Sequence, residues 1–89
     1  MFYAYILRSL KNGSFYIGST SDLAKRIARH NRGGSVYTKK IKPLELVWSG
    51  RYNTRSEAIR KEREIKSWKR KEAIEKLVEQ FHGLRGINS

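Results

Sequence analysis

The feature that most constrains the fold is an Asn12-Gly13 pair set between two segments with strand composition. An Asn-Gly pair is the strongest short signal for a β-hairpin, because a type I′ turn needs positive φ at both central positions. Residues 2–8 are rich in tyrosine and isoleucine, as β-strands are, and residues 14–19 form the second predicted strand. The chain is therefore expected to begin with an antiparallel hairpin.

The register of this hairpin decides how close its tyrosines lie. With a two-residue turn, Ser9 lies opposite Tyr16 and Leu7 lies opposite Gly18. Side chains alternate between faces, so Tyr5 shares a face with Tyr16, at about 13 Å along the strands for roughly 3.4 Å per residue. A glycine inside a strand often marks the close approach of a ligand or of another backbone, and Gly18 leaves a notch beside the tyrosines. The alternative is that these are half-buried strand tyrosines whose hydroxyls meet water.

Beyond the hairpin, the sequence predicts three helices and a third strand. Ser21 can cap a helix that carries an apolar stripe and runs to about His30. A glycine-containing segment then opens a basic loop, and a Thr-x-x-Glu capping box starts the next helix. Apolar residues at the spacing i, i+3, i+4, i+7 predict the last helix. The expected elements are strands at 2–8, 14–19 and 44–52, a helix ending near residue 30, a loop over 31–43, a helix starting at Thr54 and a helix over 71–81.

The order β-β-α-β-α-α indicates an α+β fold. It is expected to be an α/β sandwich, in which a small, mainly antiparallel three-stranded sheet is flanked by helices. The 89 residues suffice for one modest core, so we expect a single domain over residues 1–82. Residues 83–89 are expected to form a flexible tail.

Charge indicates the class of partner. Lysine and arginine number 20 against 8 acidic residues, which gives a formal net charge of +12. Such a field favours a polyanion: DNA, RNA or an anionic membrane surface. A membrane surface is disfavoured because the positive charge is spread along the chain, and the remaining alternative is a surface that is merely lysine-rich. The residues expected to contact a nucleic acid are Arg29, Lys39, Lys40 and Lys42.

Several function classes are excluded. The chain has no cysteine, so disulfide frameworks and thiolate metal sites are absent. No stretch approaches the roughly 20 apolar residues of a membrane span. The apolar segment 1–10 is too short for a signal peptide and lacks a basic leader, so we interpret it as a strand. The cytoplasm is the expected compartment.

The first predicted helix carries an arginine and a histidine at the edge of its apolar face. At about 100° per residue, Leu23 and Ile27 define that face, and Arg26 and His30 lie one turn apart beside it. An arginine there can bind a phosphate through two hydrogen bonds and stabilise charge that develops on it. The alternatives are a border arginine that extends past the core, and a histidine favoured as a cation near a helix end.

The next helix holds an inward-facing carboxylate. Ala58 and Ile65 mark its inner face, and Glu62 falls within the same arc. A carboxylate on a core-facing stripe is costly unless it is paired or coordinated. One interpretation is a salt bridge to an arginine such as Arg26. The other is a ligand for a hard cation such as Mg²⁺, which keeps several waters and takes one or two carboxylates. A two-metal site is not expected, because few other acidic residues are available to bridge it.

Together, Tyr3-Ala4-Tyr5, Tyr16-Ile17-Gly18, Arg26 and Glu62 resemble the motifs of the GIY-YIG nuclease superfamily. The resemblance covers roughly residues 2–78. It extends to the N-terminal catalytic domain of the bacterial excision-repair incision nuclease, and it is greatest for small stand-alone members.

The resemblance implies metal-dependent hydrolysis of DNA phosphodiester bonds, in DNA repair or processing, with one Mg²⁺ or Mn²⁺ ion. Tyr5 and Tyr16 would line the active site, and one of them would help to activate the attacking water. Arg26 would stabilise the scissile phosphate, His30 would be a proton-transfer partner, and Glu62 would hold the metal. The alternative is a non-catalytic or weakly active nucleic-acid-binding module on the same fold.

The chain departs from the family pattern in three places. The Gly-Ile of the first motif is Tyr3-Ala4 here, although the tyrosine that follows is kept. The lysine that some members carry after the second motif is Ser19. The asparagine near the C-terminus of some members has no convincing match, since Asn88 falls in the expected tail.

Overall fold

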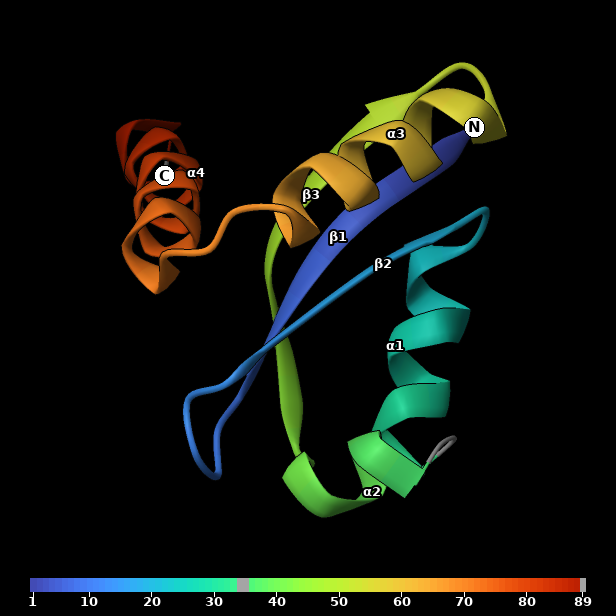
Figure 1. The fold of residues 1–89 in the computed structure, drawn as a ribbon, viewed down its shortest axis with the longest axis vertical. Coiled ribbons are helices and arrows are strands. Elements are labelled where there is room, and N and C mark those ends of the chain that lie inside the picture. The colour runs from blue at the N-terminus through green and yellow to red at the C-terminus, as the bar shows by residue number, and fades with distance from the viewer. Residues whose placement is uncertain (34–35, 89) are drawn as a thin grey trace.

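A three-stranded antiparallel sheet in the order β2-β1-β3 forms the centre of the fold (Figure 1). The structure is a computed structural model that describes the backbone of residues 1–33 and 36–88. It confirms the predicted α+β class and the helices that flank the sheet. The elements are β1 (Phe2–Ser9), β2 (Phe15–Thr20), α1 (Leu23–Asn31), α2 (Val36–Ile41), β3 (Leu44–Tyr52), α3 (Arg55–Lys66) and α4 (Lys71–Asn88).

Strand β1 is central and is covered on both faces. Its residues 4–7 are all buried, which explains why the segment is almost continuously apolar. On one face, Ala4 and Ile6 pack in a cluster that includes residues of α3 and α4. On the other face, Tyr5 and Leu7 pack with residues of α1 and α2. The helical contributors are Ile65, Ile74 and Val78 on the first face, and Leu23, Ile27 and Ile41 on the second.

The hairpin register differs from the prediction by two residues. Tyr16 pairs with Leu7, and Gly18 pairs with Tyr5. The prediction of a type I′ turn at Asn12-Gly13 was therefore wrong. Gly13 has a φ of +77°, but no non-glycine residue among those described has a positive φ, so Asn12 cannot take its place in such a turn.

A buried serine explains the longer loop. The Ser9 amide donates to the Ser14 carbonyl at 2.8 Å, which leaves residues 10–13 as the loop. The Ser9 hydroxyl accepts from the amides of Lys11 and Asn12, each at 3.1 Å, and donates to the Ile41 carbonyl at 2.6 Å. This side chain thus satisfies loop amides that a two-residue turn would not have exposed.

Two further expectations about local structure need correction. Asp22, rather than Ser21, is the N-cap of α1, and its carboxylate accepts from the Lys25 amide at 3.1 Å. The segment expected to be a loop contains the short helix α2, whose residues Thr38 and Ile41 are buried. Residues 34–35 of that expected loop lie outside the described residues.

The later helices begin close to where the sequence predicts. The Thr54 hydroxyl accepts from the Glu57 amide at 3.2 Å, as the capping box requires. Helix α3 ends at Lys66 with Ser67 as its C-cap, and residues 67–70 separate it from α4. The backbone of α4 is helical to Asn88, and the flexible tail over 83–89 stays a prediction, with Ser89 outside the described residues. Within the described chain, no helix combines the length and the apolar character that crossing a membrane requires.

Candidate active site

Two tyrosines and a histidine form an aromatic cluster on the α1 side of the sheet. The Tyr5 hydroxyl lies 3.2 Å from His30 Nε2, and both residues are buried, with 1% and 5% of their surfaces exposed. The Tyr16 ring packs against His30, with ring centroids 4.6 Å apart and a tilt of 60°. The observed register puts Tyr16 only two residues beyond the position opposite Tyr5, or about 7 Å along the strands. The corrected pairing therefore brings the two tyrosines together.

Gly18 makes room for this cluster. A Cβ atom added to Gly18 would lie 2.5 Å from the Tyr5 hydroxyl oxygen and 2.7 Å from Cζ. The Tyr5 ring therefore lies over the glycine, in the notch that the sequence predicts. Gly18 is not among the glycines with positive φ, so space rather than backbone conformation requires a glycine here.

Burial and neighbouring charges set the protonation of the cluster. Burial, with Tyr16 and Glu62 adding to it and Arg26 opposing it, raises the pKa of Tyr5 to about 12. Burial also lowers the pKa of His30, and the positive charges of Arg26 and Arg29 lower it further. At neutral pH Tyr5 is therefore a protonated phenol and His30 a neutral imidazole. His30 Nδ1 is buried and has no hydrogen-bond partner among the described residues.

Arg26 lies on α1 beside this cluster. It is half-buried, and its positive charge acts on both Tyr5 and His30, so the guanidinium lies near the two groups that carry a transferable proton. Arg26 also lines two surface cavities, described below. The sequence places this arginine at the edge of the apolar face of α1, and the structure agrees.

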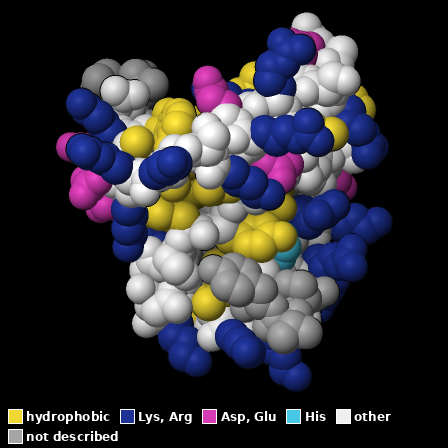
Figure 2. Space-filling view, viewed as in Figure 1, with side chains coloured by type: hydrophobic (Ala, Val, Ile, Leu, Met, Phe, Trp, Pro, Cys, Tyr) yellow, Lys and Arg dark blue, Asp and Glu magenta, His cyan; other side chains and the backbone are white. Residues whose placement is uncertain are grey.

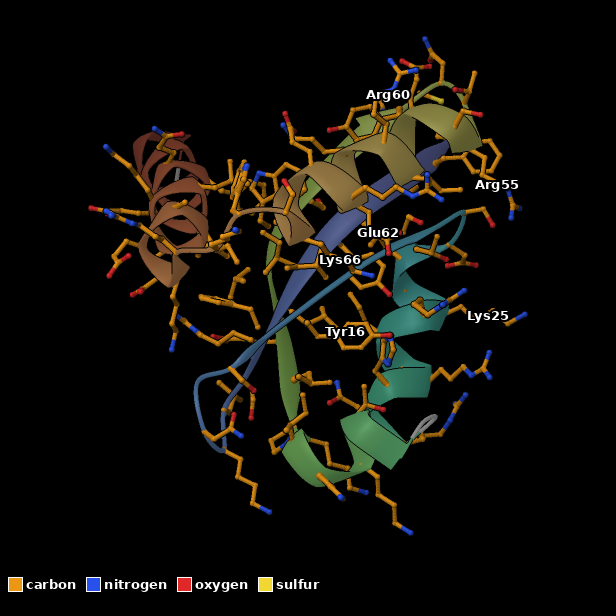
Figure 3. All side chains as sticks on the ribbon, in the orientation of Figure 1. Tyr16, Lys25, Arg55, Arg60, Glu62 and Lys66 are labelled. Carbon is orange, nitrogen blue, oxygen red and sulfur yellow. The ribbon has the colours of Figure 1, made fainter. Side chains whose placement is uncertain are left out.

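Glu62 approaches from α3, across the edge of the sheet formed by β2 (Figure 3). Its Oε1 accepts from the Ser19 hydroxyl at 2.7 Å, and its Oε2 accepts from Lys66 Nζ at 2.6 Å. The side chain is 18% exposed. Burial alone would raise its pKa, but the hydrogen bonds from Lys66 and Ser19 and the charges of Lys66 and Arg63 outweigh burial, and the net pKa is lowered. Glu62 is therefore ionised at neutral pH.

The observed partners bear on the first interpretation of the inward carboxylate, a salt bridge to an arginine such as Arg26. Among the described ion pairs Glu62 joins Lys66, one turn along α3, and not Arg26. The Glu62–Lys66 pair therefore has a net charge near zero, while the charge of Arg26 is not neutralised by Glu62. The salt bridge to Arg26 that the sequence left open is not what the structure shows.

The side chains that could coordinate a metal ion are few in the described part of this site. Within the described residues, no cluster of three or more histidine, aspartate or glutamate side chains is present. A protein cage for a metal is therefore not formed there. An ionised Glu62 with a neighbouring Ser19 hydroxyl matches the sparser requirement of Mg²⁺, which keeps most of its waters and takes one or two carboxylates. The residues fit a single divalent cation at Glu62.

The residues predicted to contact DNA are all exposed, and Figure 2 shows basic side chains over much of one face. Arg29 lies on α1, near enough to His30 for its charge to lower the histidine pKa. Lys39 and Lys40 lie on α2, and Lys42 follows it, at the end of the molecule away from α3 (Figure 1). The arrangement brings Arg29 beside the aromatic cluster, and the three lysines form a separate group. Their role in DNA binding stays a prediction.

Two residues of this site were missed by sequence reasoning. Lys66 stands four residues after Glu62, a spacing at which a helical Glu–Lys pair is expected, so a signal was present. Ser19 was noted as a departure from the family pattern, but its bond to Glu62 joins residues 43 positions apart in the chain, and no local pattern reveals it.

The fold and this constellation of side chains define a GIY-YIG catalytic domain. Residues 1–76 match the GIY-YIG catalytic domain family, and the chain belongs to that family. The predicted family is thus confirmed, over nearly the span that the motifs indicate.

The most similar relatives found carry the name UPF0213 protein. One from Staphylococcus saprophyticus is 41% identical over 78 residues, which are 86% of this chain and 94% of the relative. One from Staphylococcus epidermidis is 38% identical over the same coverage. The solution NMR structure of a UPF0213 protein from Bacillus halodurans is similar to this chain with a TM-score of 0.52 and 38% identity, and covers 97% of this chain and 87% of its own.

Proposed function

We propose that this protein is a metal-dependent endonuclease that hydrolyses DNA phosphodiester bonds. The observation that carries the proposal is the meeting of Tyr5, Tyr16, Arg26 and His30 with the ionised Glu62 at the β2 edge of the sheet. In this set Tyr5 and His30 can transfer a proton, Arg26 can bind a phosphate, and Glu62 can coordinate a metal ion. A DNA substrate is supported by membership of a family of nucleases and by the net charge of +12.

The hydrolysis requires a proton acceptor for the attacking water. As the water oxygen bonds to phosphorus, the bond from phosphorus to one sugar oxygen breaks, and that oxygen takes a proton from solvent. We assign the acceptor to the Tyr5–His30 pair. Tyr5 Oη takes the proton of the water while giving its own to His30 Nε2, 3.2 Å away. Neutral His30 is suited to this role, because its lowered pKa leaves Nε2 able to accept at neutral pH.

Charge on the phosphate would be met by Arg26 and by a cation that Glu62 would hold. Arg26 can donate two parallel hydrogen bonds to phosphate oxygens. A divalent ion bound there supplies Lewis-acid stabilisation of the phosphoryl oxygens. Glu62 holds that ion, and Ser19 orients the carboxylate through Oε1. Tyr16 packs on His30 and keeps its ring beside Tyr5.

The test is cleavage of labelled single- and double-stranded DNA with Mg²⁺ or Mn²⁺. Wild-type protein should cut, and chelator or Glu62→Gln should abolish cutting while leaving binding in place. Glu64→Gln is the matched control, because Glu64 is an exposed glutamate of the same helix that pairs with Lys61. It should cut as wild type does. The proposal fails if wild type binds DNA but cuts no substrate with either ion.

That same failure would support the alternative, a basic nucleic-acid-binding module on this fold. A specific observation favours it: Glu62 is already paired with Lys66 and Ser19, so the carboxylate is satisfied without a metal. In that case Glu62→Gln and wild type would bind DNA equally, with the same dependence on salt. The setting we propose for the nuclease is DNA repair or processing in the cytoplasm, in keeping with a cysteine-free chain.

A further inference from the structure

A small cavity opens where the end of β2 and the turn into α1 face the first turn of α3. Its volume is about 100 Å³. The charged residues that line it are Arg26 and Arg55, and no acidic side chain is among its described lining residues. Hydroxyl groups at the end of β2 and in the turn that follows it complete the polar part of the wall, from Ser19, Thr20 and Ser21.

The two guanidinium groups carry charge that no ion pair among the described residues neutralises, and Arg26 is also hydrogen-bonded to Tyr5. Neither Arg26 nor Arg55 belongs to a salt bridge among the described residues. Arg55 is held in place by Phe2, with its Cζ 5.5 Å from the ring centroid, a distance typical of a cation–π contact. Arg55 also stands in the first turn of α3, where the helix dipole disfavours a cation, so helix stability does not account for an arginine here.

The cavity adjoins the residues assigned to hydrolysis. Arg26 lines it and also lines a neighbouring cavity of about 360 Å³, with Lys25, Arg29 and Asp22 among the other residues of that wall. Figure 3 shows Arg55 on α3 and Lys25 on α1 on the same side of the molecule. Arg26 thus lies between two cavities lined by basic side chains. This is the position expected of a residue that contacts the middle one of several successive backbone phosphates.

We propose that the cavity of Arg55 and the β2–α1 turn binds a backbone phosphate of the nucleic acid next to the one at which hydrolysis takes place. The inference rests on the proposed function of Arg26 and Glu62. Arg55 donates to the phosphate oxygens, and the Ser21 hydroxyl, which is exposed, adds a neutral donor. A contact of this kind fixes the register of the strand over the site without reading its sequence.

The experiment measures binding of a labelled 20-nucleotide DNA, single-stranded and duplex, in chelator, across a series of salt concentrations. Arg55→Gln should raise Kd by roughly tenfold and reduce the slope of log K against log salt by about 1. Arg51→Gln is the matched control, because Arg51 is an exposed arginine that does not line the cavity. It should change Kd by less than about twofold. Equal increases in Kd for the two variants would overturn the proposal, because they would show that binding depends only on the total positive charge of the protein.

Kinetics separate this inference from the function on which it rests. If the protein cuts DNA, Arg55→Gln should raise KM and leave kcat near wild type, since a neighbouring phosphate is bound equally before and during the reaction. Wild-type binding, salt slope and KM in Arg55→Gln would overturn the subsite and leave the nuclease intact. Weakened binding by Arg55→Gln in a protein that never cuts would overturn the nuclease and leave Arg55 as a contact to a backbone phosphate.

A second measurement keeps the proposal falsifiable if Arg55→Gln does not fold. Inorganic phosphate is titrated into ¹⁵N-labelled wild-type protein at constant ionic strength, with chloride as the comparison. Saturable shifts at the Arg55 Nε and the Ser21 amide, absent with chloride, support the subsite. Shifts that are absent, or that are the same for both anions, overturn it.

Discussion

The Tyr5 ring lies directly over Gly18 across the β1–β2 pair, so that a Cβ at position 18 would come within 2.5 Å of the tyrosine hydroxyl. This contact places the hydroxyl 3.2 Å from His30 Nε2. The glycine of the second motif therefore has a packing role: it determines where the proton carried by Tyr5 lies.

Gly18→Ala should accordingly disturb both stability and the site. The added methyl group forces the Tyr5 ring to move, and overpacking of this kind costs about 1–3 kcal/mol of unfolding free energy. We expect that loss in urea denaturation, together with loss of DNA cleavage. In a Tyr5→Ala background the same substitution meets no ring, and its cost should nearly vanish, which a double-mutant cycle measures. A cost that is the same in both backgrounds would contradict the contact.

The fold was predictable where the sequence acts locally. Strand alternation placed Tyr5, Tyr16 and Gly18 on one face, and helical periodicity turned Glu62 inward; both hold in the structure. These patterns depend on backbone geometry alone, which every strand and helix shares. The α+β class followed from the order of such elements.

What escaped prediction depends on contacts between distant residues. The hairpin register is set by Ser9, a buried hydroxyl bonded to Ile41, 32 residues away. Helix α2 forms in a segment without strong helical periodicity, and it is anchored by buried Thr38 and Ile41. A two-residue turn predicts that Tyr5 and Tyr16 lie about 13 Å apart along the strands, at roughly 3.4 Å per residue. That distance was wrong because the predicted register was wrong.

Asn31 joins the end of α1 to the start of β3. Its Nδ2 donates to the Leu44 carbonyl at 3.1 Å, and the Leu44 amide donates to its Oδ1 at 2.7 Å. Asn31→Ala leaves both backbone groups of a buried residue unsatisfied, so we expect a loss of about 1–3 kcal/mol of unfolding free energy. Asn53→Ala, at an exposed site, should stay within about 0.5 kcal/mol of wild type. Equal denaturation midpoints for the two variants would contradict a structural role for the clamp.

His30 should make stability depend on pH. Its folded pKa is lowered from 6.5, first by burial and then by Arg26 and Arg29. Between these two pKa values the unfolded chain binds a proton that the folded chain does not. The stabilisation is therefore fully present above about pH 6.5 and is lost as the pH falls through the lower folded pKa. Urea denaturation should show stability falling in that window.

The chain has two histidines, so the measurement is made in a His82→Gln background, where His30 is the sole histidine. His30→Gln in that background should flatten the slope of stability against pH just below pH 6.5. Titration of Glu62 does not interfere, because its pKa is lowered from 4.5 and its stabilisation is lost only as the pH falls through that lower value. A slope that survives His30→Gln would contradict the lowered histidine pKa.

Lys66 occupies the place beside Glu62 where a divalent cation would compete. Its Nζ lies 2.6 Å from Oε2, with the lysine side chain 52% exposed and the glutamate 18% exposed. An ion pair this open is worth about 0.2–1 kcal/mol, so Lys66→Gln should tighten binding of Mn²⁺ by about fivefold at most. The pKa of Glu62 should rise in the variant, because the hydrogen bond and charge of Lys66 help to lower it.

Paramagnetic broadening of the Ser19 and Glu62 amide signals reports Mn²⁺ binding without reference to cleavage. Glu62→Gln should abolish the broadening, which establishes the site. Lys61→Gln is the matched control for Lys66→Gln, because Lys61 pairs with Glu64 on the same helix and should leave the Mn²⁺ affinity unchanged. A weaker affinity in Lys66→Gln would mean that the lysine orients Glu62 for the metal rather than competing with it.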